Sequence, residues 1–528
     1  MTLDVSTLNL PIGRATSSFE PVRLDLPTAF ADFIGQEYAV GCDSEHRKSH
    51  GLYLTPPRVA NFMACMIRLH DTFRLLDPAA GAGVLICAVV ENLASQPNPP
   101  RKIEITAYEI DSSLAMSLRR VIGHLTKWAA NKKIQVIATI LEQDFILAKA
   151  SSLTQKNHGQ FDAVIANPPY FKVGKEDPRA IAAKAVVHGQ PNIYGLFMAV
   201  AGSLLKEGGD FVFITPRSFA SGPYFKRFRE HFFSVVRPVK VHVFGSRRDA
   251  FSRDTVLQEN VILHGIRHDN WSKKPESYPF IISSSAGTAD LEYSTEWKAK
   301  LSDAIDSNNL SGAFRLPATQ ADDAILRRFD GWTGSLHRYG LDISTGPVVP
   351  FRATEHLAEK SNCITVPLLW LNHVRIMGVQ WPNNGRKPEY INYKSDSRRL
   401  LVPNNTYVLL RRFSAKEENR RMTAAPLLAG QLPCEMIGLE NHLNYIHRPE
   451  GIITEDEAFG LAALYNSSLF DGYFRCINGN TQVSATELRA MPLPPLEAII
   501  KLGQTIRKSG NNLGLIDQLV DKLATATA

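Results

Sequence analysis

Residues 75–83 have the sequence LLDPAAGAG, in which a short apolar run ends in an aspartate and is followed by a turn of small residues. Gly81 and Gly83 can adopt positive φ and let a ligand approach the backbone closely. The apolar stretch from Val84 to Leu93 comes next and is typical of a buried helix. This order predicts one unit of a parallel α/β sheet, in which the first amides of the helix can face a polar or anionic group. An ordinary tight turn between a strand and a helix is the alternative.

The chain on both sides of this turn alternates between short apolar runs and helix-like stretches. Such alternation predicts a Rossmann-like, doubly wound and mostly parallel sheet. The last two apolar runs have only about a dozen residues between them, too few for a helical crossover, so we expect them to pair antiparallel. The seven expected strands are residues 73–76, 103–110, 134–139, 161–166, 211–215, 239–244 and 256–263.

The composition changes after this alternating region. Residues 271–279 are polar and carry prolines, and residues 283–287 are SSSAG, a composition typical of a linker. Beyond them the pattern is irregular, with short strand-like pieces and a helical tail. The expected divisions are an N-terminal extension at 1–48, a main α/β domain at 49–268, a linker at 269–310, and a mixed α/β domain with a C-terminal helix at 311–528.

The bulk composition is that of an ordinary soluble globular protein, with 44% hydrophobic and 21% charged residues. The net charge of +7 is compatible with a polyanionic partner, but many basic proteins bind none. No apolar run is long enough to cross a membrane, and residues 1–30 lack the apolar stretch of a signal peptide, so we expect a cytoplasmic protein. The six cysteines are scattered without paired spacing, which argues against a zinc site and a disulfide framework.

Acidic residues follow two of the predicted strands. Glu109 ends the second strand, where a carboxylate is well placed to accept hydrogen bonds from both hydroxyls of a ribose; a solvated strand-end acid is the alternative. Asp144 and Phe145 follow the third strand. A carboxylate there can accept from the amino group of an adenine ring, and the phenylalanine can lie against that ring. The dipeptide alone indicates little, and its position after the third strand is what points to a role in binding adenine.

Residues 161–171, FDAVIANPPYF, are the strongest signal in the chain, a buried strand that ends in Asn-Pro-Pro-Tyr. The side-chain oxygen of Asn167 and the carbonyl oxygen of Pro168 offer two acceptors for the N–H groups of an aromatic amine. Accepting both bonds would localise the lone pair of the amine and make it a better nucleophile. The two prolines fix φ and remove competing amide donors, and Tyr170 offers a flat face for a ring. A proline-rich loop that merely ends a strand is the alternative.

The order of these motifs resembles that of the gamma class of adenine-N6 DNA methyltransferases, the Taq-type enzymes of type II restriction-modification systems. GLYLTPPRVANFM, residues 51–63, is similar to the element that precedes the glycine turn in this class, with a Thr-Pro pair opening a helix. The resemblance implies a DNA methyltransferase that uses S-adenosylmethionine and no metal ion. It implies a catalytic set of Asn167, Pro168, Pro169 and Tyr170, and a cofactor-binding set of Thr55, Asp77, Ala79, Gly81, Gly83, Glu109, Ile110, Asp144 and Phe145.

A target adenine inside a duplex must be rotated out before it can be methylated. Residues 241–263 resemble the later element of the class, in which an aromatic residue stacks on the flipped base opposite the tyrosine. Phe251 is the first candidate for this role and Phe244 the second, and a buried strand-end phenylalanine is the alternative for each. The basic residues that we expect to face DNA phosphates are Arg247, Arg248 and Arg253.

Two short segments of the C-terminal region resemble recognition regions of restriction-modification methyltransferases. They are ISTGPVVPFR at 343–352, which is nearest to the PstI-type group, and INGNTQVSATELRAMPLPP at 477–495. We therefore expect this region to read a site on double-stranded DNA. The candidate contacts are Arg411 and Arg412, for which solvated surface is the alternative, and Asn480 and Gln482, which could bond an adenine edge or simply cap a turn. Since the sequence shows no nuclease constellation, we expect a separate endonuclease from which the host DNA is protected, and a monomer suffices for one adenine per turnover.

Three other functions stay open. The chain could be the modification subunit of a multi-subunit system with a separate specificity chain. It could be an amino-methyltransferase for protein glutamine or RNA, because amides and aryl amines pose the same problem of a delocalised lone pair. Methylation of cytosine N4 is the third, although that activity more often goes with Ser-Pro-Pro-Tyr.

Overall fold

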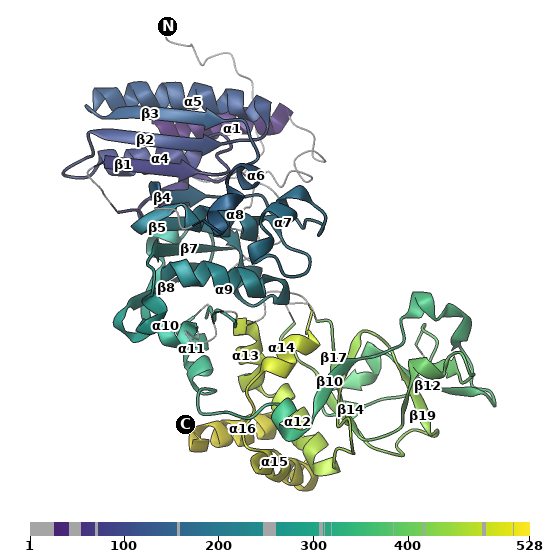
Figure 1. The fold of residues 1–528 in the computed structure, drawn as a ribbon. Helices are drawn as coiled ribbons and strands as arrows, with labels where there is room; N and C mark the ends of the chain where they lie inside the picture. The colour runs from purple at the N-terminus through teal and green to yellow at the C-terminus, as the bar shows by residue number, and fades with distance from the viewer. Residues whose placement is uncertain are drawn as a thin grey trace, which may run out of the picture.

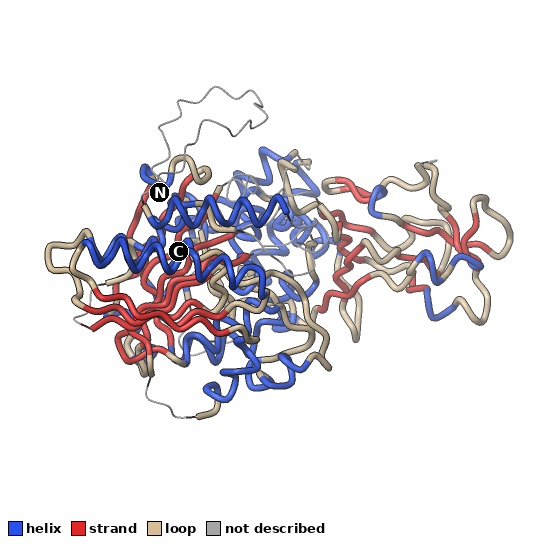
Figure 2. The backbone as a smooth tube through the Cα atoms, turned by 90° about the horizontal axis from the view of Figure 1, so that it is seen from above, coloured by secondary structure: helices blue, strands red, loops and turns tan. Residues whose placement is uncertain are grey.

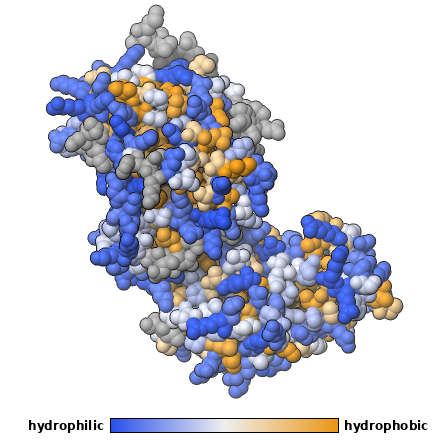
Figure 3. All heavy atoms as spheres, viewed as in Figure 1, coloured by the Kyte–Doolittle hydropathy of each residue, from blue (hydrophilic) through white to orange (hydrophobic). Residues whose placement is uncertain are grey.

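The computed structural model describes residues 26–41, 54–68, 72–155, 159–245, 260–305, 310, 312–317, 319–383, 385–414, 418–477, 482–510 and 512–527. The chain forms an N-terminal α/β part and a C-terminal part that extends to one side of it (Figure 1). On the face shown in Figure 3 the surface is mostly hydrophilic, with hydrophobic residues in small patches over both parts. None of the helices in the described ranges is long and apolar enough to span a membrane.

Within the described ranges, the main sheet has nine strands in the order β3-β2-β1-β4-β5-β7-β6-β8-β9. Strands β1 to β5 are parallel, β7 runs antiparallel between β5 and β6, β8 is parallel to β6, and β9 is antiparallel to β8. The strands are β1 (Thr72–Asp77), β2 (Lys102–Tyr108), β3 (Gln135–Leu141), β4 (Phe161–Ala166), β5 (Leu205–Pro216), β6 (Val236–Phe244), β7 (Asn260–Arg267), β8 (Pro279–Ser285) and β9 (Thr295–Lys300).

This arrangement confirms a large mixed α/β sheet and the antiparallel pairing of the last two predicted strands. The expected number of seven strands is wrong, because β8 and β9 extend the sheet beyond β6. The expected linker at 269–310 is wrong for the same reason, since residues 279–300 supply both added strands. Their sequences PFIISSS and TEWKAK are rich in polar residues, as suits strands near an edge of a sheet.

Helices cover both faces of the main sheet (Figure 1). In β4, Ala163 and Ile165 belong to the core on one face and Val164 and Ala166 to the core on the other, which explains why every residue of this strand is buried. The first core includes α1 (Pro27–Gly41), α3 (Pro57–Ala64), α4 (Val84–Ala94) and α5 (Ser112–Asn131). The second includes α6 (Phe145–Lys149), α7 (Pro178–Ala182), α8 (Ile193–Ser203) and α9 (Lys226–Val235).

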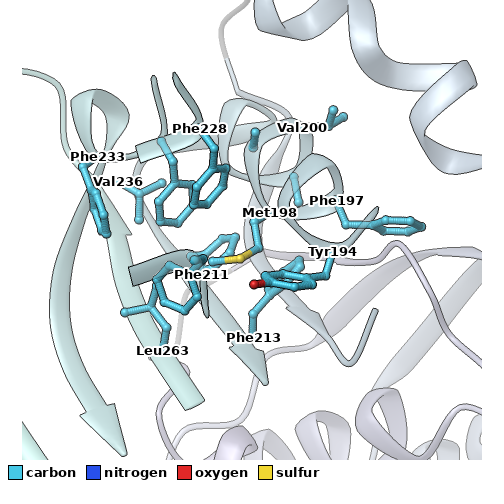
Figure 4. Packing of buried hydrophobic residues seen from close by; sticks show 14 of the residues in the cluster. Tyr194, Phe197, Met198, Val200, Phe211, Phe213, Phe228, Phe233, Val236 and Leu263 are labelled. Atoms are coloured by element: carbon cyan, nitrogen blue, oxygen red, sulfur yellow. The ribbon is translucent and has the colours of Figure 1, made fainter. Parts of the chain in front are cut away.

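Aromatic residues fill much of the second core. Figure 4 shows Met198 of α8 close to Phe211 and Phe213 of β5, with Phe228 of α9 nearby. The rings of Phe211 and Phe213 stack with centroids 4.2 Å apart. All residues of α8 are buried, which accounts for its lack of a polar face. This packing fixes α8, one end of which borders the site described below.

In the C-terminal part, the described residues form helices and three small sheets, ordered β10-β20-β17-β18, β11-β15-β12-β19-β16 and β13-β14. Figure 2 shows a strand-rich lobe projecting away from the main sheet. The strands are β10 (Asp342–Thr345), β11 (Leu357–Ala358), β12 (Thr365–Leu369), β13 (Val374–Arg375), β14 (Gly378–Val379), β15 (Tyr390–Asn392), β16 (Leu401–Pro403), β17 (Tyr407–Arg411), β18 (Ala424–Leu427), β19 (Met436–Leu439) and β20 (Leu443–His447). The helices are α11 (Gln320–Arg327), α12 (Glu455–Asn466), α13 (Ser468–Ile477), α14 (Ala485–Ala490), α15 (Leu496–Ser509) and α16 (Leu513–Thr527), whereas the short α10 (Leu301–Ala304) packs in the second core of the main sheet.

Among the described residues this part has three hydrophobic cores, and strand β17 lies between two of them. Val408 and Leu410 pack with the helices, whereas Tyr407 and Leu409 pack with the strand-rich lobe. The alternation of side chains along a single strand thus holds the lobe against the helices.

A buried arginine joins the two parts of the chain. Arg217 follows β5 and is 9% exposed. Its Nη2 donates to the carbonyl oxygens of Leu316 and of Cys476, the latter at 2.6 Å. The C-terminal end of α13 is therefore attached directly to the end of a strand of the main sheet.

Candidate active site

A cavity of about 350 Å³ lies at the carboxyl ends of β1, β2 and β4. This is where the order of the parallel strands reverses, the place at which open α/β sheets bind ligands. Its wall brings together residues that are far apart in the sequence. Those predicted to form the site are Ala79, Gly81, Glu109, Ile110, Asp144, Phe145, Asn167 and Pro169. Thr55 lines an adjoining smaller cavity of about 30 Å³ together with Gly81 and Asn167. Asp77, Gly83, Pro168 and Tyr170 line neither cavity.

The glycine turn has the conformation that its sequence requires. Gly81 and Gly83 have φ of 53° and 86°, in the left-handed region that favours glycine. Gly83 is also the N-cap of α4, and a Cβ there would lie 2.7 Å from Leu118 Cδ1. A side chain at either position would strain the turn, and one at Gly83 would also disturb the packing of α5.

Asp77, at the end of β1, is fully buried. Its Oδ1 accepts from the backbone N–H of Ala79 at 3.1 Å, but its Oδ2 has no hydrogen-bond partner among the described residues. Burial raises the pKa of this carboxyl from 3.8 to about 8; the bond from Ala79 opposes the shift and the charge of Glu109 adds to it. The site thus holds a buried acceptor that a cationic donor would satisfy.

Glu109 links the end of β2 to the glycine turn. Its Oε2 accepts from the N–H of Gly81 and its Oε1 from the N–H of Asp111, both at 2.9 Å. Each carboxylate oxygen keeps a lone pair for a further donor. Burial raises the pKa of this carboxyl, and the bonds from Asp111 and Gly81 oppose the shift.

The far end of the cavity combines an acid with apolar surfaces. Asp144 caps α6, and its Oδ1 accepts from the N–H of Leu147 at 3.0 Å. Phe145 is buried and stacks on Phe197, with ring centroids 5.5 Å apart. Ile110 lines the same cavity although its side chain is 60% exposed. An aromatic ring system would find apolar contacts here, with a hydrogen-bond acceptor beside them.

Several residues that line this cavity were not among the predicted site residues, and Phe197 and Arg179 are two of them. Phe197 lies inside an apolar helix, where its sequence gives no signal that distinguishes it from the core. Arg179 lines the cavity with its guanidinium held by both oxygens of Asp177, at 2.8 and 2.6 Å, and 5.4 Å from the ring of Phe171. Its position depends on how the segment after β4 folds back over the cavity, which local sequence does not reveal.

The Asn-Pro-Pro-Tyr loop is held by hydrogen bonds at both ends. Asn167 Nδ2 donates to Thr55 Oγ1 at 3.1 Å, joining two segments predicted separately. The Tyr170 hydroxyl lies 2.5 Å from Asn167 Oδ1 and 3.0 Å from the carbonyl oxygen of Ile214. Tyr170 is 7% exposed and packs edge-to-face against Tyr194, so this tyrosine holds the asparagine and presents little of its ring at the surface.

The predicted DNA-facing residues are only partly described. Phe251, Arg247, Arg248, Arg253 and Asn480 lie outside the described residues. Phe244 is wrong as a base-stacking candidate, because this residue is 4% exposed and packs in the core on the face of the sheet that α3 and α4 cover.

The predicted C-terminal contacts lie close together. Arg411 Nε donates to the carbonyl oxygen of Val374, and Arg412 Nη1 to that of Asn441, both at 2.9 Å. Gln482 is exposed and bridges to Phe413, next to Arg412. The described residues hold no group of three or more histidine, cysteine or acidic side chains that could bind a metal ion.

Comparison with known proteins identifies the family. Residues 102–251 match the family described as Eco57I restriction-modification methylase. The chain is 32% identical to the type II methyltransferase M.PstI of Providencia stuartii over 95% of this chain and 97% of that protein. It is also 32% identical to M.BsuBI of Bacillus subtilis, over 90% of this chain and 93% of that protein. Among solved structures, the type IIG restriction endonuclease BpuSI is similar with a TM-score of 0.43 and 15% identity, over 95% of this chain and 67% of that one. The chain therefore belongs to the type II methyltransferases of restriction-modification systems.

Proposed function

We propose that this protein methylates N6 of an adenine that has been rotated out of double-stranded DNA, with S-adenosylmethionine as the methyl donor. The observation that carries the proposal is the position of Asn167. It lines the cavity formed by the glycine turn and Glu109, and it also lines the adjoining cavity beside Thr55. An acceptor for an amino group thus lies next to a site suited to a nucleoside.

The side chains of the cavity fit this cofactor. Glu109 has lone pairs left for the ribose hydroxyls. Asp77 itself lines neither cavity, but the glycine turn that follows it does, and its unpartnered Oδ2 is suited to the amino group of the methionine part. Asp144 can accept from the amino group of the cofactor adenine, with Ile110 and Phe197 as apolar neighbours. The bound cofactor supplies a methyl group on a positively charged sulfur.

Under this proposal Asn167 and Pro168 activate the substrate amine. The side-chain oxygen of Asn167 and the carbonyl oxygen of Pro168 each accept a hydrogen bond from one N–H group of the amine, and so localise the nitrogen lone pair. The bonds of Asn167 to Thr55 and Tyr170 orient the amide before the substrate arrives. Because the leaving group is neutral, positioning contributes more than a strong base would.

The two parts of the chain divide the work under this proposal. The α/β part, extended to β9, binds the cofactor and the flipped base, while residues 311–528 read the target site, with Arg411, Arg412 and Gln482 among the contacts. The remaining assignments are a role for Phe251 on the flipped base, a monomeric enzyme in the cytoplasm, and a separate endonuclease from which methylation protects host DNA.

The test is methyl transfer from tritium-labelled cofactor to plasmid DNA by the purified full chain, followed by identification of the modified nucleoside. The expected product is N6-methyl-2′-deoxyadenosine in DNA, at one site that sequencing of DNA from expressing cells reveals. N4-methylcytosine would overturn the choice of base. Label in RNA or protein glutamine with none in DNA would overturn the substrate. A requirement for a second polypeptide would overturn the monomeric enzyme.

A further inference from the structure

The segment Gly346–Arg352 follows β10 and is held rigidly by the backbone. Gly346 N–H donates to the carbonyl oxygen of Leu443 at 2.9 Å, and Val348 N–H to that of Leu439 at 3.0 Å. A Cβ at Gly346 would lie 2.3 Å from the carbonyl oxygen of Glu440, so only glycine allows this approach. The loop therefore leaves β10 in one fixed direction.

This loop presents an aromatic ring to solvent. Phe351 is 76% exposed, and the guanidinium of Arg352, also exposed, lies 5.3 Å from its ring centroid. A phenylalanine in water forgoes the favourable free energy that burial of its ring would give. A ring held in water on a fixed loop beside an arginine is suited to a partner that has both flat rings and negative charge.

The same backbone network joins this loop to three other segments. Asn441 N–H donates to the carbonyl oxygen of Val348 at 2.9 Å, and Arg412 Nη1 to that of Asn441 at 2.9 Å. Arg412 N–H donates to the carbonyl oxygen of His442, and Val483 N–H to that of Arg412, at 2.9 and 2.7 Å. We call the side chains that these segments carry the linked rim: Phe351, Arg352, Arg412, His442 and Gln482.

The linked rim is attached to the catalytic side of the molecule. Cys476, six residues before Gln482, accepts from Arg217 at 2.6 Å. Arg217 in turn follows Ile214 on β5, whose carbonyl oxygen accepts from Tyr170. The two segments that resemble recognition regions, 343–352 and 477–495, thus meet each other and connect to the Asn-Pro-Pro-Tyr loop.

We propose that the linked rim contacts the DNA duplex beside the flipped adenine, with Phe351 inserted against the base stack and Arg352 paired with a backbone phosphate. Apolar wedges that part neighbouring bases are a known way to deform a duplex, and extrusion of a base leaves a gap in the stack. Arginine supplies the planar, charged donors that phosphates bind. This proposal rests on the proposed function.

The experiment compares Phe351→Ala and Arg352→Ala in the full chain, with Tyr293→Ala as the matched control. Tyr293 is 84% exposed and lies between β8 and β9, outside the linked rim. The probe is an unmethylated duplex that contains the site recognised by the enzyme. In it 2-aminopurine replaces the target adenine, so that extrusion of this base raises the fluorescence of 2-aminopurine. Binding is measured by anisotropy, and cofactor binding by calorimetry.

Phe351→Ala should reduce the fluorescence rise and the turnover number by about tenfold while cofactor binding stays unchanged. Arg352→Ala should weaken binding to cognate and random duplexes alike by about tenfold and lower the salt dependence by about one phosphate contact, with Arg352→Lys restoring most of both. Tyr293→Ala should behave as the wild type.

Two results would overturn the proposal. One is wild-type binding and extrusion by both variants in a preparation whose wild type methylates DNA. The other is a change of oligomeric state in Phe351→Ala with normal extrusion, which would assign the ring to a protein partner. A wild-type chain that methylates no DNA would instead overturn the proposed function itself.

Discussion

The side-chain amide of Asn167 donates a hydrogen bond of 3.1 Å to the hydroxyl of Thr55, across 112 residues of sequence. Thr55 stands just before α3, and Asn167 just after β4. An amide that donates from its nitrogen to a fixed partner has its oxygen fixed as well. The bond therefore determines where the side-chain oxygen points that we propose as an acceptor for the substrate amine.

Replacement of Asn167 by alanine removes one of the two acceptors. We expect the turnover number to fall by about 100-fold or more, the size of effect seen when one pre-oriented polar group is lost. The dissociation constant for the cofactor, measured by calorimetry, should stay within about threefold, because under our proposal the side-chain oxygen bonds the substrate amine and the cofactor's polar groups bond other residues of the cavity. Full activity in this variant would refute the role of the loop.

Thr55 can be tested separately from the asparagine that it orients. Thr55→Val keeps the shape of the side chain but removes its hydroxyl, and we expect the turnover number to fall by about tenfold, as for a lost hydrogen bond of about 1.4 kcal/mol. Thr55→Ser keeps the hydroxyl and should retain most of the activity. Equal losses in the two variants would show that packing, and not the bond to Asn167, is what matters.

Asp77→Asn should stabilise the cofactor-free protein. Since the folded carboxyl keeps its proton up to a pKa of about 8 while the ordinary value is 3.8, the folded state binds an extra proton between these pH values. The free energy of unfolding of the wild type therefore falls as pH rises through this window and is level above it. Chemical denaturation at pH 8 should find the variant more stable, by on the order of 2 kcal/mol, and the difference should shrink towards pH 4. Cofactor affinity should fall by about tenfold or more if Asp77 holds the methionine amino group.

Tyr38 is linked through Asp111 to Glu109, the carboxylate that we propose for the cofactor ribose. Its hydroxyl donates to Asp111 Oδ2 at 2.8 Å, and Asp111 N–H donates to Glu109 Oε1 at 2.9 Å. We expect Tyr38→Phe to raise the KM for the cofactor by about threefold to tenfold, the range of one hydrogen bond, with an unchanged turnover number at saturation. A fall in the turnover number alone would contradict this role. The helix α1 then serves the cofactor site, which the expected N-terminal extension at 1–48 did not suggest.

Arg217→Gln should weaken the joint between the two parts. Charged hydrogen bonds contribute about 1.5–3 kcal/mol each, so we expect a loss of stability and a DNA-methylation rate reduced by about tenfold. Cofactor affinity should be unaffected, because Arg217 lines neither cavity. Equal weakening of DNA methylation and cofactor binding would show general unfolding, which a melting curve would confirm.

The sequence predicted those features that depend on local pattern. The seven apolar runs became β1 to β7, and the glycine turn, Glu109 and Asn167 meet in one cavity because parallel strands end at the same edge. The polar strands β8 and β9 lacked such a pattern. Phe244 carried an aromatic signal but is buried, and Phe197 carried none but lines the cavity.

The fold of the C-terminal part could not be predicted from local sequence pattern for another reason. Its sheets are built from pairs that are remote in sequence, such as Leu368 with Gly438 and Ser344 with Tyr445. Strands this short contain too few residues to show a recognisable alternation of apolar and polar side chains. The position of Arg217 depends on these remote contacts, since its acceptors lie in segments whose arrangement the sequence did not reveal.

The acceptors of Arg217 are main-chain carbonyls, which every amino acid possesses. Substitution of the side chains at 316 and 476 therefore leaves the attachment chemically intact. The part that we propose to read bases could therefore change its side chains while keeping its alignment with the methylating centre, so that new sequence preferences need no rebuilding of the enzyme.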